Sequence, residues 1–312
     1  MLVVEIQPDL SFKILDREKD TTRLGDGSFE KHRLRKSSMR RALNVIGQFH
    51  KAAKKLRVRR TIGVATSAVR DAKNGKEFIR EVYRRTGIRI RIVSGDEEGR
   101  LIELAARSNM DVKGKKTLVV DIGGGSMELI VGDGKKHFYL KSFPLGVTRL
   151  TDHFLSKDPP SAKQMRKLEK HIEKALRVPA KNIRKYKVVK VIGTAGTLIN
   201  LGSMVYESEY SKRLKLVHHF MLQRMHLEEI HARIVGLSLK ERLNFPGLDA
   251  KRADIILAGS LLVRTLMRLL GIERITISKQ GIREGLILDF IAKNRKSLLH
   301  SPSGRIPSRK IG

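Results

Sequence analysis

The sequence predicts an α/β protein of two domains, and three observations support this prediction. Short apolar strands and helical segments alternate through the first 108 residues, which is the order of a mainly parallel or mixed sheet covered by helices. From residue 117 onward three apolar stretches follow one another closely, which marks a second domain. With 312 residues, 40% of them apolar, the chain is long enough for two domains that each bury a core.

The first domain is predicted over residues 1–113. Apolar residues recur at helical spacing between basic residues over 42–53, which predicts an amphipathic helix with a cationic outer face. Further helices are expected over 76–85 and 97–108. The predicted strands lie at residues 2–6, 12–15, 61–65 and 88–92.

The second domain is predicted over residues 114–292. Its expected strands lie at 117–122, 127–131, 138–142, 188–192 and 274–278. Asp133-Gly134 provides the hairpin turn between the second and third of these. A closing helix beyond Gly281 is expected to pack back on the first domain. The basic tail over 293–312 contains two prolines and is expected to be disordered.

Charge is the unusual feature of the composition. The chain has 65 Lys and Arg against 32 Asp and Glu, which gives a formal net charge of +33. Such a field attracts polyanions, whether nucleic acid, polyphosphate or an acidic membrane face, without choosing among them. Aromatic residues make up only 5%, so we expect no single-strand stacking platform and no specific nucleic-acid partner. A solvated basic surface without such a ligand is the alternative.

Targeting and membrane signals are missing from the sequence. No window approaches the roughly 18 uncharged apolar residues of a membrane helix, and the first residues lack the pattern of a signal peptide. The chain has no cysteine, which excludes disulfides and thiolate metal sites. We therefore expect a soluble, cytoplasmic protein without a membrane partner.

The sharpest local signal is a glycine-rich turn between two predicted strands, Asp121-Ile-Gly-Gly-Gly-Ser-Met-Glu128. Glycines let successive backbone N–H groups turn toward one anion, and Ser126 adds a hydroxyl, so Gly123, Gly124, Gly125 and Ser126 are candidate phosphate ligands. Asp121 at the strand end is placed to hold Mg²⁺, which commonly takes one or two carboxylates plus substrate phosphate. A plain glycine-rich hairpin turn is the alternative.

A second loop, Gly193-Thr-Ala-Gly-Thr197, also follows a predicted strand and precedes a helix expected to begin near Leu198. Helix N-termini offer unpaired N–H groups and a favourable dipole for phosphate. Gly193, Thr194, Gly196 and Thr197 are therefore further candidate phosphate ligands. Alone, the segment is also typical of a strand-to-helix turn, and its pairing with the first loop is what favours phosphate.

Two charged residues follow strands of the first domain. Arg70 can reach a phosphate with its planar guanidinium, or can simply pair with an acid such as Asp71 on the surface. Glu98 begins a predicted helix, where acids are ordinary, but a carboxylate facing an interdomain cleft can instead take a proton from water. Both alternatives stay open on the local sequence.

Other catalytic motifs fail specific tests. The chain contains no G-x-x-x-x-G-K-[ST] segment, so a P-loop ATPase is not expected. His226 and His231 are five residues apart instead of the four that a zinc-binding helix needs. His218-His219 is typical of a polar surface pair.

Taken together, these segments closely resemble the exopolyphosphatase and guanosine pentaphosphate phosphatase family, in its short two-domain form. The matching segments occur in family order over about residues 2–290. They are Arg23-Leu-Gly-Asp-Gly27, Ala65-Thr-Ser-Ala-Val-Arg-Asp71, Ser94-Gly-Asp-Glu-Glu98, Asp121-Ile-Gly-Gly-Gly-Ser-Met-Glu128, Pro144-Leu-Gly-Val-Thr-Arg-Leu150, Gly193-Thr-Ala-Gly-Thr197, Ala253-Asp-Ile-Ile-Leu-Ala-Gly259 and Gly281-Ile-Arg-Glu-Gly285.

The resemblance implies the two-domain fold shared by actin and sugar kinases, related to ribonuclease H, with an active-site cleft between the domains. It implies that Glu98 activates water, that Arg70 and the loops hold phosphates, and that Mg²⁺ near Asp121 offsets charge on the terminal phosphoryl group. Glu128 would support the site by accepting hydrogen bonds or orienting the metal-bound water. A homodimer is expected only through the resemblance.

The leading hypothesis is an exopolyphosphatase that removes terminal phosphate from inorganic polyphosphate. A guanosine pentaphosphate (pppGpp) 5′-phosphatase would use the same site. A non-catalytic polyanion-binding regulatory protein is the alternative from another class, and a sugar or acetate kinase shares only the superfold.

The sequence departs from the family pattern at two places. Relatives begin with a strand carrying Asp-x-Gly-Ser-Asn-Ser, the first phosphate loop, and this sequence starts just beyond it. We expect that Met1 is an internal methionine; otherwise the protein lacks that strand and half of the phosphate clamp. Gly99 stands where relatives often have alanine, which weakens the helix start by up to about 1 kcal/mol.

Overall fold

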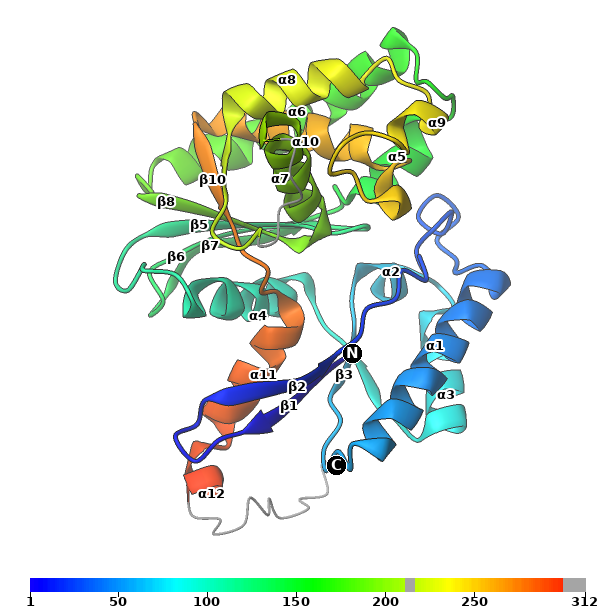
Figure 1. Ribbon diagram of the computed structural model, residues 1–312, viewed down its shortest axis with the longest axis vertical. Coiled ribbons are helices and arrows are strands. Elements are labelled where there is room, and N and C mark those ends of the chain that lie inside the picture. The colour runs from blue at the N-terminus through cyan, green and yellow to red at the C-terminus, as the bar shows by residue number, and fades with distance from the viewer. Residues whose placement is uncertain (211–216, 300–312) are drawn as a thin grey trace.

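The computed structural model describes residues 1–210 and 217–299, and it confirms the predicted α/β class (Figure 1). Its largest element is a six-stranded mixed sheet in the order β7-β6-β5-β8-β10-β9. The three central strands are parallel and are β5 (Thr117–Ile122), β8 (Lys190–Thr194) and β10 (Arg274–Ile277). The antiparallel strands are β6 (Met127–Gly132), β7 (His137–Phe143) and β9 (Met221–Gln223).

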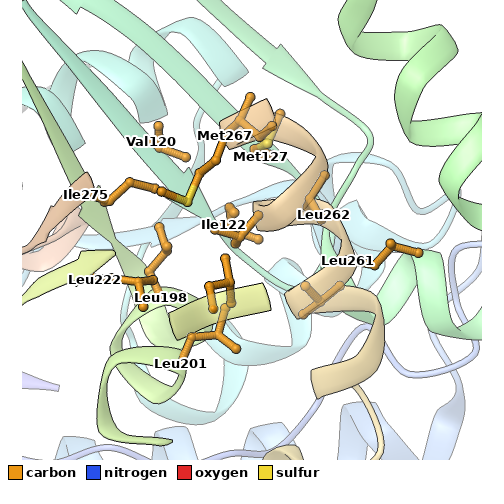
Figure 2. Close-up of a cluster of buried hydrophobic side chains, with 14 of the residues drawn as sticks. Val120, Ile122, Met127, Leu198, Leu201, Leu222, Leu261, Leu262, Met267 and Ile275 are labelled. Atoms are coloured by element: carbon orange, nitrogen blue, oxygen red, sulfur yellow. The ribbon is translucent and has the colours of Figure 1, made fainter. Parts of the chain in front are cut away.

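Helices from the second half of the chain cover one face of this sheet (Figure 1). Alternate residues of a strand point to opposite faces, so Val120 and Ile122 of β5 face these helices. Figure 2 shows them packed with Leu198 and Leu261 in one apolar core. The helices around this core are α5 (Val147–Phe154), α6 (Ala162–Arg184), α7 (Ala195–Tyr210), α8 (Arg224–Ile234), α9 (Leu239–Arg242) and α10 (Ile256–Leu270), with the 3₁₀ turn η1 (Ala250–Arg252).

The other face of the sheet is covered by α4 (Gly95–Ser108), which packs against α11 (Ile282–Lys293). Val119 of β5 and Ile130 of β6 point to this face and belong to one apolar cluster with Ile102 of α4. A side chain at Gly285 would overlap the backbone of α4, so the two helices approach closely only because that residue is glycine. Helix α4 thus lies on the large sheet although it precedes residue 113, and the division into domains stays a prediction.

The first part of the chain differs from the single sheet that we predicted. The antiparallel hairpin of β1 (Leu2–Ile6) and β2 (Phe12–Arg17) forms one sheet, and the parallel pair of β3 (Gly63–Ala65) and β4 (Ile90–Ile92) forms another. Among the described residues, no strand is hydrogen-bonded between these two sheets. The helices of this part are α1 (Lys36–Lys55), α2 (Ser67–Arg70) and α3 (Gly75–Thr86).

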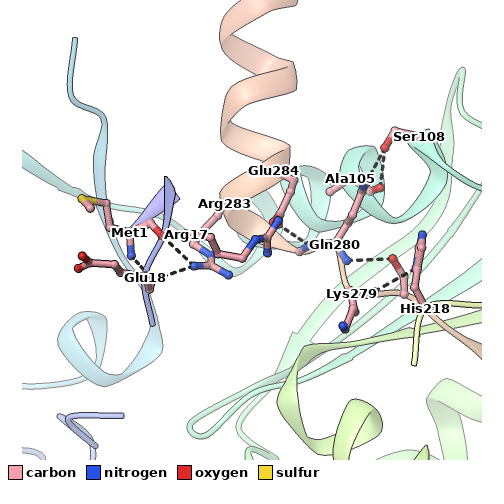
Figure 3. A network of polar contacts seen from close by, with 12 residues as sticks. Met1, Arg17, Glu18, Ala105, Ser108, His218, Lys279, Gln280, Arg283 and Glu284 are labelled. Carbon is pink, nitrogen blue, oxygen red and sulfur yellow. Dashed lines mark hydrogen bonds and ion pairs between the residues drawn. The ribbon is translucent and has the colours of Figure 1, made fainter. Parts of the chain in front are cut away.

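Polar contacts at the start of α11 connect both parts of the molecule (Figure 3). The guanidinium of Arg283 donates to the backbone oxygens of Met1 and Glu18, at 3.0 and 3.2 Å. Arg17 pairs with the buried Glu284 at 2.9 Å. Because α11 also packs on α4, these contacts connect the β1–β2 hairpin to the helices beneath the large sheet.

The end of the chain corrects one prediction. Residues from 293 onward were predicted to be disordered, but Arg295–Leu299 form a short helix, α12. Its first turn is closed by Asn294, whose backbone oxygen accepts from the N–H of Leu298 at 3.0 Å and from the hydroxyl of Ser297 at 2.9 Å. The remaining residues of the predicted tail, 300–312, lie outside the described residues.

Helix α10 is buried along most of its length, yet it carries Arg264 and Arg268. Both arginines pair with glutamates of neighbouring helices. Within residues 1–210 and 217–299, no helix has both the length and the apolar character needed to cross a bilayer.

Replacing Gly47 by alanine is expected to stabilise the protein by about 0.5–1 kcal/mol. Gly47 lies inside α1, and an added Cβ would meet no heavy atom within 4 Å. Alanine therefore gains helix propensity without a clash. Urea unfolding measures the change.

Gly87→Ala is the matched control. A Cβ at Gly87 also meets nothing within 4 Å, but the φ of this residue is +68°. We expect it to destabilise the protein by about 1–2 kcal/mol, because L-residues are strained in the left-handed region. Equal effects of the two substitutions would contradict this account.

Candidate active site

A cavity of about 230 Å³ lies between the two predicted domains. Residues 23–26, Phe29, residues 66–68 and Glu98 line it from the first part of the chain, and the glycine-rich turn 123–126 with Thr148 lines it from the second. The carboxyl ends of β3 and β5 both lead into it, as is usual for ligand sites in α/β proteins. The cavity therefore brings together Glu98 and the first predicted phosphate loop.

The carbonyl groups of the three glycines in the turn are directed at the first turn of α5. The oxygen of Gly123 accepts from the N–H of Val147 at 3.0 Å, and that of Gly124 accepts from the N–H of Thr148 at 2.9 Å. The oxygen of Gly125 accepts from a side chain of α5, at 2.8 Å. The turn is thus attached to α5 through these acceptors, while the N–H of Gly123 donates to the oxygen of Ser126 within the turn, at 3.0 Å.

The C=O and N–H groups of a trans peptide point in opposite directions, so the N–H groups of Gly124, Gly125 and Ser126 point away from α5. None of them has a hydrogen-bond acceptor within the described part of the chain. All three residues line the cavity. Successive N–H groups in this arrangement form a concave anion-binding site, suited in size and charge to phosphate.

Glu98 lies in the first turn of α4, whose N-cap Ser94 accepts from the N–H of Glu97 at 3.1 Å. Its side chain contributes to the cavity but is only 10% exposed. Burial raises the pKa of Glu98 to about 7, even though Arg70 donates to its Oε2 at 3.0 Å and opposes the shift. A carboxyl group with a pKa near neutrality is suited to accept a proton from water and to release it again.

Arg70 ends α2 and is aimed at Glu98. The same Nη1 that reaches Glu98 also donates to the backbone oxygen of Val93 at 3.0 Å, and Nε lies 3.6 Å from Asp71. Arg70 was interpreted from the sequence either as a phosphate ligand or as an arginine paired with an acid. It pairs with Glu98 and Asp71, and its partner Glu98 lines the cavity, so both interpretations stay open. Its predicted contact with phosphate stays a prediction.

Asp121 and Glu128 are direct neighbours across the antiparallel pair of β5 and β6, so both carboxyl groups lie on one face of the sheet. Asp121 accepts from the hydroxyl of Thr194, and Glu128 accepts from Ser142 at 2.7 Å. Burial raises the pKa of Asp121 to about 6 and that of Glu128 to about 8, and the charges of Glu98 and Asp121 raise the latter further.

The carboxylates fit a cation that arrives with its substrate better than one held by the protein alone. Within the described residues no three His, Cys, Asp or Glu side chains converge on one point. Mg²⁺ nevertheless needs only one or two carboxylates when phosphate and water supply the rest. The Oε2 of Glu128 is buried without a hydrogen-bond partner, and it faces acids whose pKa values are raised. These residues are compatible with Mg²⁺ shared with phosphate.

The raised pKa values predict that Mg²⁺ stabilises the protein more at high pH. A buried acid whose folded pKa lies above its unfolded value stabilises the fold at low pH, and this contribution is lost as pH rises from about 4 through the folded pKa. For Asp121, Glu98 and Glu128 this stabilising contribution is lost between about pH 4 and pH 8. A bound cation offsets the resulting charge, so Mg²⁺ should raise Tm more at about pH 8 than at about pH 5. Equal shifts at both pH values, measured by calorimetry with Asp121→Asn as control, would contradict this expectation.

The second predicted loop contacts the end of β5 but does not line the cavity. Helix α7 begins at Ala195, three residues earlier than predicted, so Gly196 and Thr197 belong to its first turn. The hydroxyl of Thr197 donates to the backbone oxygen of Ile122 at 3.1 Å, and the guanidinium of Arg252 covers Gly196.

These contacts hold the second loop against β5 and under Arg252, so its residues are not directed into the cavity. Thr194 contacts Asp121, whereas Gly193, Gly196 and Thr197 do not line the 230 Å³ cavity. A phosphate role for this loop stays a prediction.

Sequence reasoning assigned no role to several residues that the structure brings to the cavity. Arg23 and Phe29 line it, and Asp71 and Arg149 connect its two sides. Three of them belong to segments that we matched to the family, Arg23 to Gly27, Ala65 to Asp71 and Pro144 to Leu150. For Arg23, the sequence signal that could have indicated a site residue was its place in the glycine-rich segment Arg23-Leu-Gly-Asp-Gly27.

A larger cavity, of about 570 Å³, lies at the opposite end of the sheet, near the first residues of β5, β8 and β10. It contains none of the predicted site residues, and its lining includes Val189 and Met221. Of these two cavities in the described part of the chain, the smaller is the better candidate, because it joins an acid of raised pKa to unpaired backbone donors.

Comparison with known proteins gives consistent results. The model of the Ppx/GppA phosphatase family matches residues 2–294. The chain is 30% identical over 299 residues to Exopolyphosphatase 1 of Mycobacterium tuberculosis, covering 94% of this chain and 86% of that protein. It is 34% identical over 237 residues to an uncharacterised protein of Streptomyces coelicolor, covering 74% and 68%.

Solved structures share the fold. The Ppx/GppA family member of Aquifex aeolicus is 26% identical with a TM-score of 0.76, and the match covers 94% of each chain. An exopolyphosphatase of Cytophaga hutchinsonii has a TM-score of 0.86 at 24% identity, also over 94% of each chain.

Proposed function

Because the chain belongs to the Ppx/GppA phosphatase family, we propose that it is an exopolyphosphatase, which releases orthophosphate from the end of inorganic polyphosphate. One observation carries this proposal. A buried carboxyl group with a pKa of about 7, that of Glu98, shares a cavity with three unpaired N–H groups suited to phosphate. A general base and an anion site at one place are what hydrolysis of a phosphoric anhydride requires.

In the proposed reaction, the N–H groups of Gly124, Gly125 and Ser126 hold the non-bridging oxygens of the terminal phosphoryl group. A water molecule beside Glu98 attacks the terminal phosphorus atom and gives its proton to the carboxylate. The bond from that phosphorus to the bridging oxygen breaks, and the bridging oxygen stays with the shortened chain. Positioning and charge stabilisation dominate such a transfer, since phosphoryl groups need little covalent help.

Arg70 has two tasks in this proposal. Its Nη1 holds the carboxylate of Glu98 in place at 3.0 Å, and its positive charge keeps part of the Glu98 population ionised despite burial. When substrate enters, a guanidinium at this place can also stabilise the negative charge on the transferred phosphoryl group.

Mg²⁺ would be held by Asp121 with help from Glu128, and when bound it would neutralise charge on the phosphate oxygens. The buried, unpartnered Oε2 of Glu128 supports this assignment. The formal net charge of +33 favours a long polyanion, because a positive protein attracts the remaining length of a polyphosphate chain.

A comparison of substrates tests the choice of polyphosphate. The kcat/KM for orthophosphate release should be higher with long-chain polyphosphate than with guanosine pentaphosphate, when both are measured with Mg²⁺ at one ionic strength. The reverse order would assign the same site to the nucleotide. Binding of polyphosphate without release of orthophosphate from either substrate would support the non-catalytic alternative.

A further inference from the structure

Arg149 contacts residues that line the active-site cavity from both parts of the chain. It lies in the first turn of α5, and its side chain is only 17% exposed. The Nε group donates to the backbone oxygen of Gly125 at 2.8 Å, and Nη2 donates to the carboxylate of Asp71. The guanidinium also lies over the ring of Phe29, 4.2 Å from its centre. One side chain thus joins the glycine-rich turn to two segments from the first part of the chain.

The contact with Asp71 leads on to the general base. Asp71 lies between two arginines, since its Oδ2 accepts from Arg149 and its Oδ1 is 3.6 Å from the Nε of Arg70. Arg70 in turn donates to Glu98 at 3.0 Å. An unbroken series of polar contacts therefore runs from the phosphate-binding turn through Arg149, Asp71 and Arg70 to Glu98.

We propose that Arg149 is a positioning residue, which sets the glycine-rich turn and the Arg70–Glu98 pair in register across the cleft. This inference rests on the proposed function. By holding the oxygen of Gly125, Arg149 directs the N–H of the next residue, Ser126, toward the phosphate. By holding Asp71, it keeps that carboxylate from drawing Arg70 away from Glu98. Arg149 does not line the cavity, so it acts through these neighbours.

The geometry requires arginine at this position. A guanidinium offers five N–H donors in a fixed plane, so one group can serve Gly125 and Asp71 together while its face rests on Phe29. A lysine keeps the charge but carries its three N–H donors on one nitrogen, so it does not reproduce the separate donor positions of Nε and Nη2. Arg149→Lys therefore separates the charge from the two-sided contact.

Steady-state kinetics of wild type, Arg149→Lys, Asp71→Asn and the double variant test the proposal. We expect Arg149→Lys to lower kcat for orthophosphate release by about 10- to 100-fold, since small misplacements of reacting groups have effects of this size. KM for long-chain polyphosphate should change by less than about 3-fold, because Arg149 does not contact the distant phosphates. Arg264→Lys is the control, since Arg264 is a partly buried, ion-paired arginine of α10 away from the cavity.

The double variant separates positioning from loss of structure. If Arg149 acts through Asp71, the fall in kcat of the double variant is smaller than the product of the two single effects. An unchanged kcat in Arg149→Lys, a rise in KM as large as the fall in kcat, or effects that simply multiply would overturn the proposal. A wild-type protein that releases no orthophosphate would instead refute the proposed function itself. Asp71 is one-third exposed, so Asp71→Asn keeps the test possible if Arg149→Lys fails to fold.

Discussion

Glu98→Gln is expected to lower kcat for orthophosphate release by about 10²- to 10⁴-fold, the range typical of a lost general base. Glutamine keeps the size of the side chain but cannot take a proton from water. The Oε2 of Glu98 is held by Arg70 at 3.0 Å, and the side chain is nearly buried. We therefore expect that bulk water does not take over the role of the carboxylate as proton acceptor. Initial rates with long-chain polyphosphate and Mg²⁺ measure the loss.

Glu97→Gln is the matched control for this experiment. Glu97 is the preceding residue of the same helix turn, but its carboxylate pairs with Arg91 outside the cavity. We expect near wild-type kcat from it. Equal activity of Glu98→Gln and Glu97→Gln would show that Glu98 does not take the proton of the attacking water.

Gly146→Ala is expected to abolish most of the activity, by about 100-fold or more, and to destabilise the fold by about 1–3 kcal/mol. Gly146 is the N-cap of α5, and a Cβ there would overlap the backbone of Gly124 and Gly125. Backbone atoms cannot move aside as a flexible side chain does. The turn would have to shift, and its three N–H groups would lose their alignment.

Two measurements on Gly146→Ala distinguish a local shift from general unfolding. Urea unfolding gives the stability, and orthophosphate binding by calorimetry reports on the turn. Gly47→Ala serves as the control, because it lies in α1 with no atom near its added Cβ and should keep full activity. Full phosphate binding by Gly146→Ala would contradict the role given to the turn.

Elements with a strong local pattern could be predicted from the sequence. The run of apolar residues over 117–122 predicted β5, which is buried along its whole length, and the turn at Asp133-Gly134 was correctly placed. The family resemblance, and not the local sequence, placed the glycine-rich turn and Glu98 in one cleft, and both line the same cavity. For β5 and the hairpin turn, the residue types themselves indicate the local structure.

Contacts between distant segments could not be predicted in this way. Arg149 and Asp71 are 78 residues apart, and nothing in either segment indicates that they meet. The same holds for Arg252 at the first turn of α7, because a local pattern does not show which side chain will cover Gly196. Positions that depend on packing between segments therefore needed the structure.

Short elements were missed for a related reason. Helices α2 and α12 have four and five residues, too few for a helical period to appear in the sequence. Both are closed by local backbone contacts, such as the N–H of Arg70 to the oxygen of Thr66 at 2.9 Å. Helix α2 places Arg70 beside Glu98, so this omission concerned an element of the site.

Hydrolysis of polyphosphate in water enriched in ¹⁸O tests the central claim most directly. If water beside Glu98 attacks the terminal phosphorus atom, each orthophosphate released with Mg²⁺ carries one ¹⁸O atom, and the chains shorten one unit at a time. Mass spectrometry of the product measures the label. Label found in the remaining chain instead of the orthophosphate, or release of internal fragments, would contradict the account.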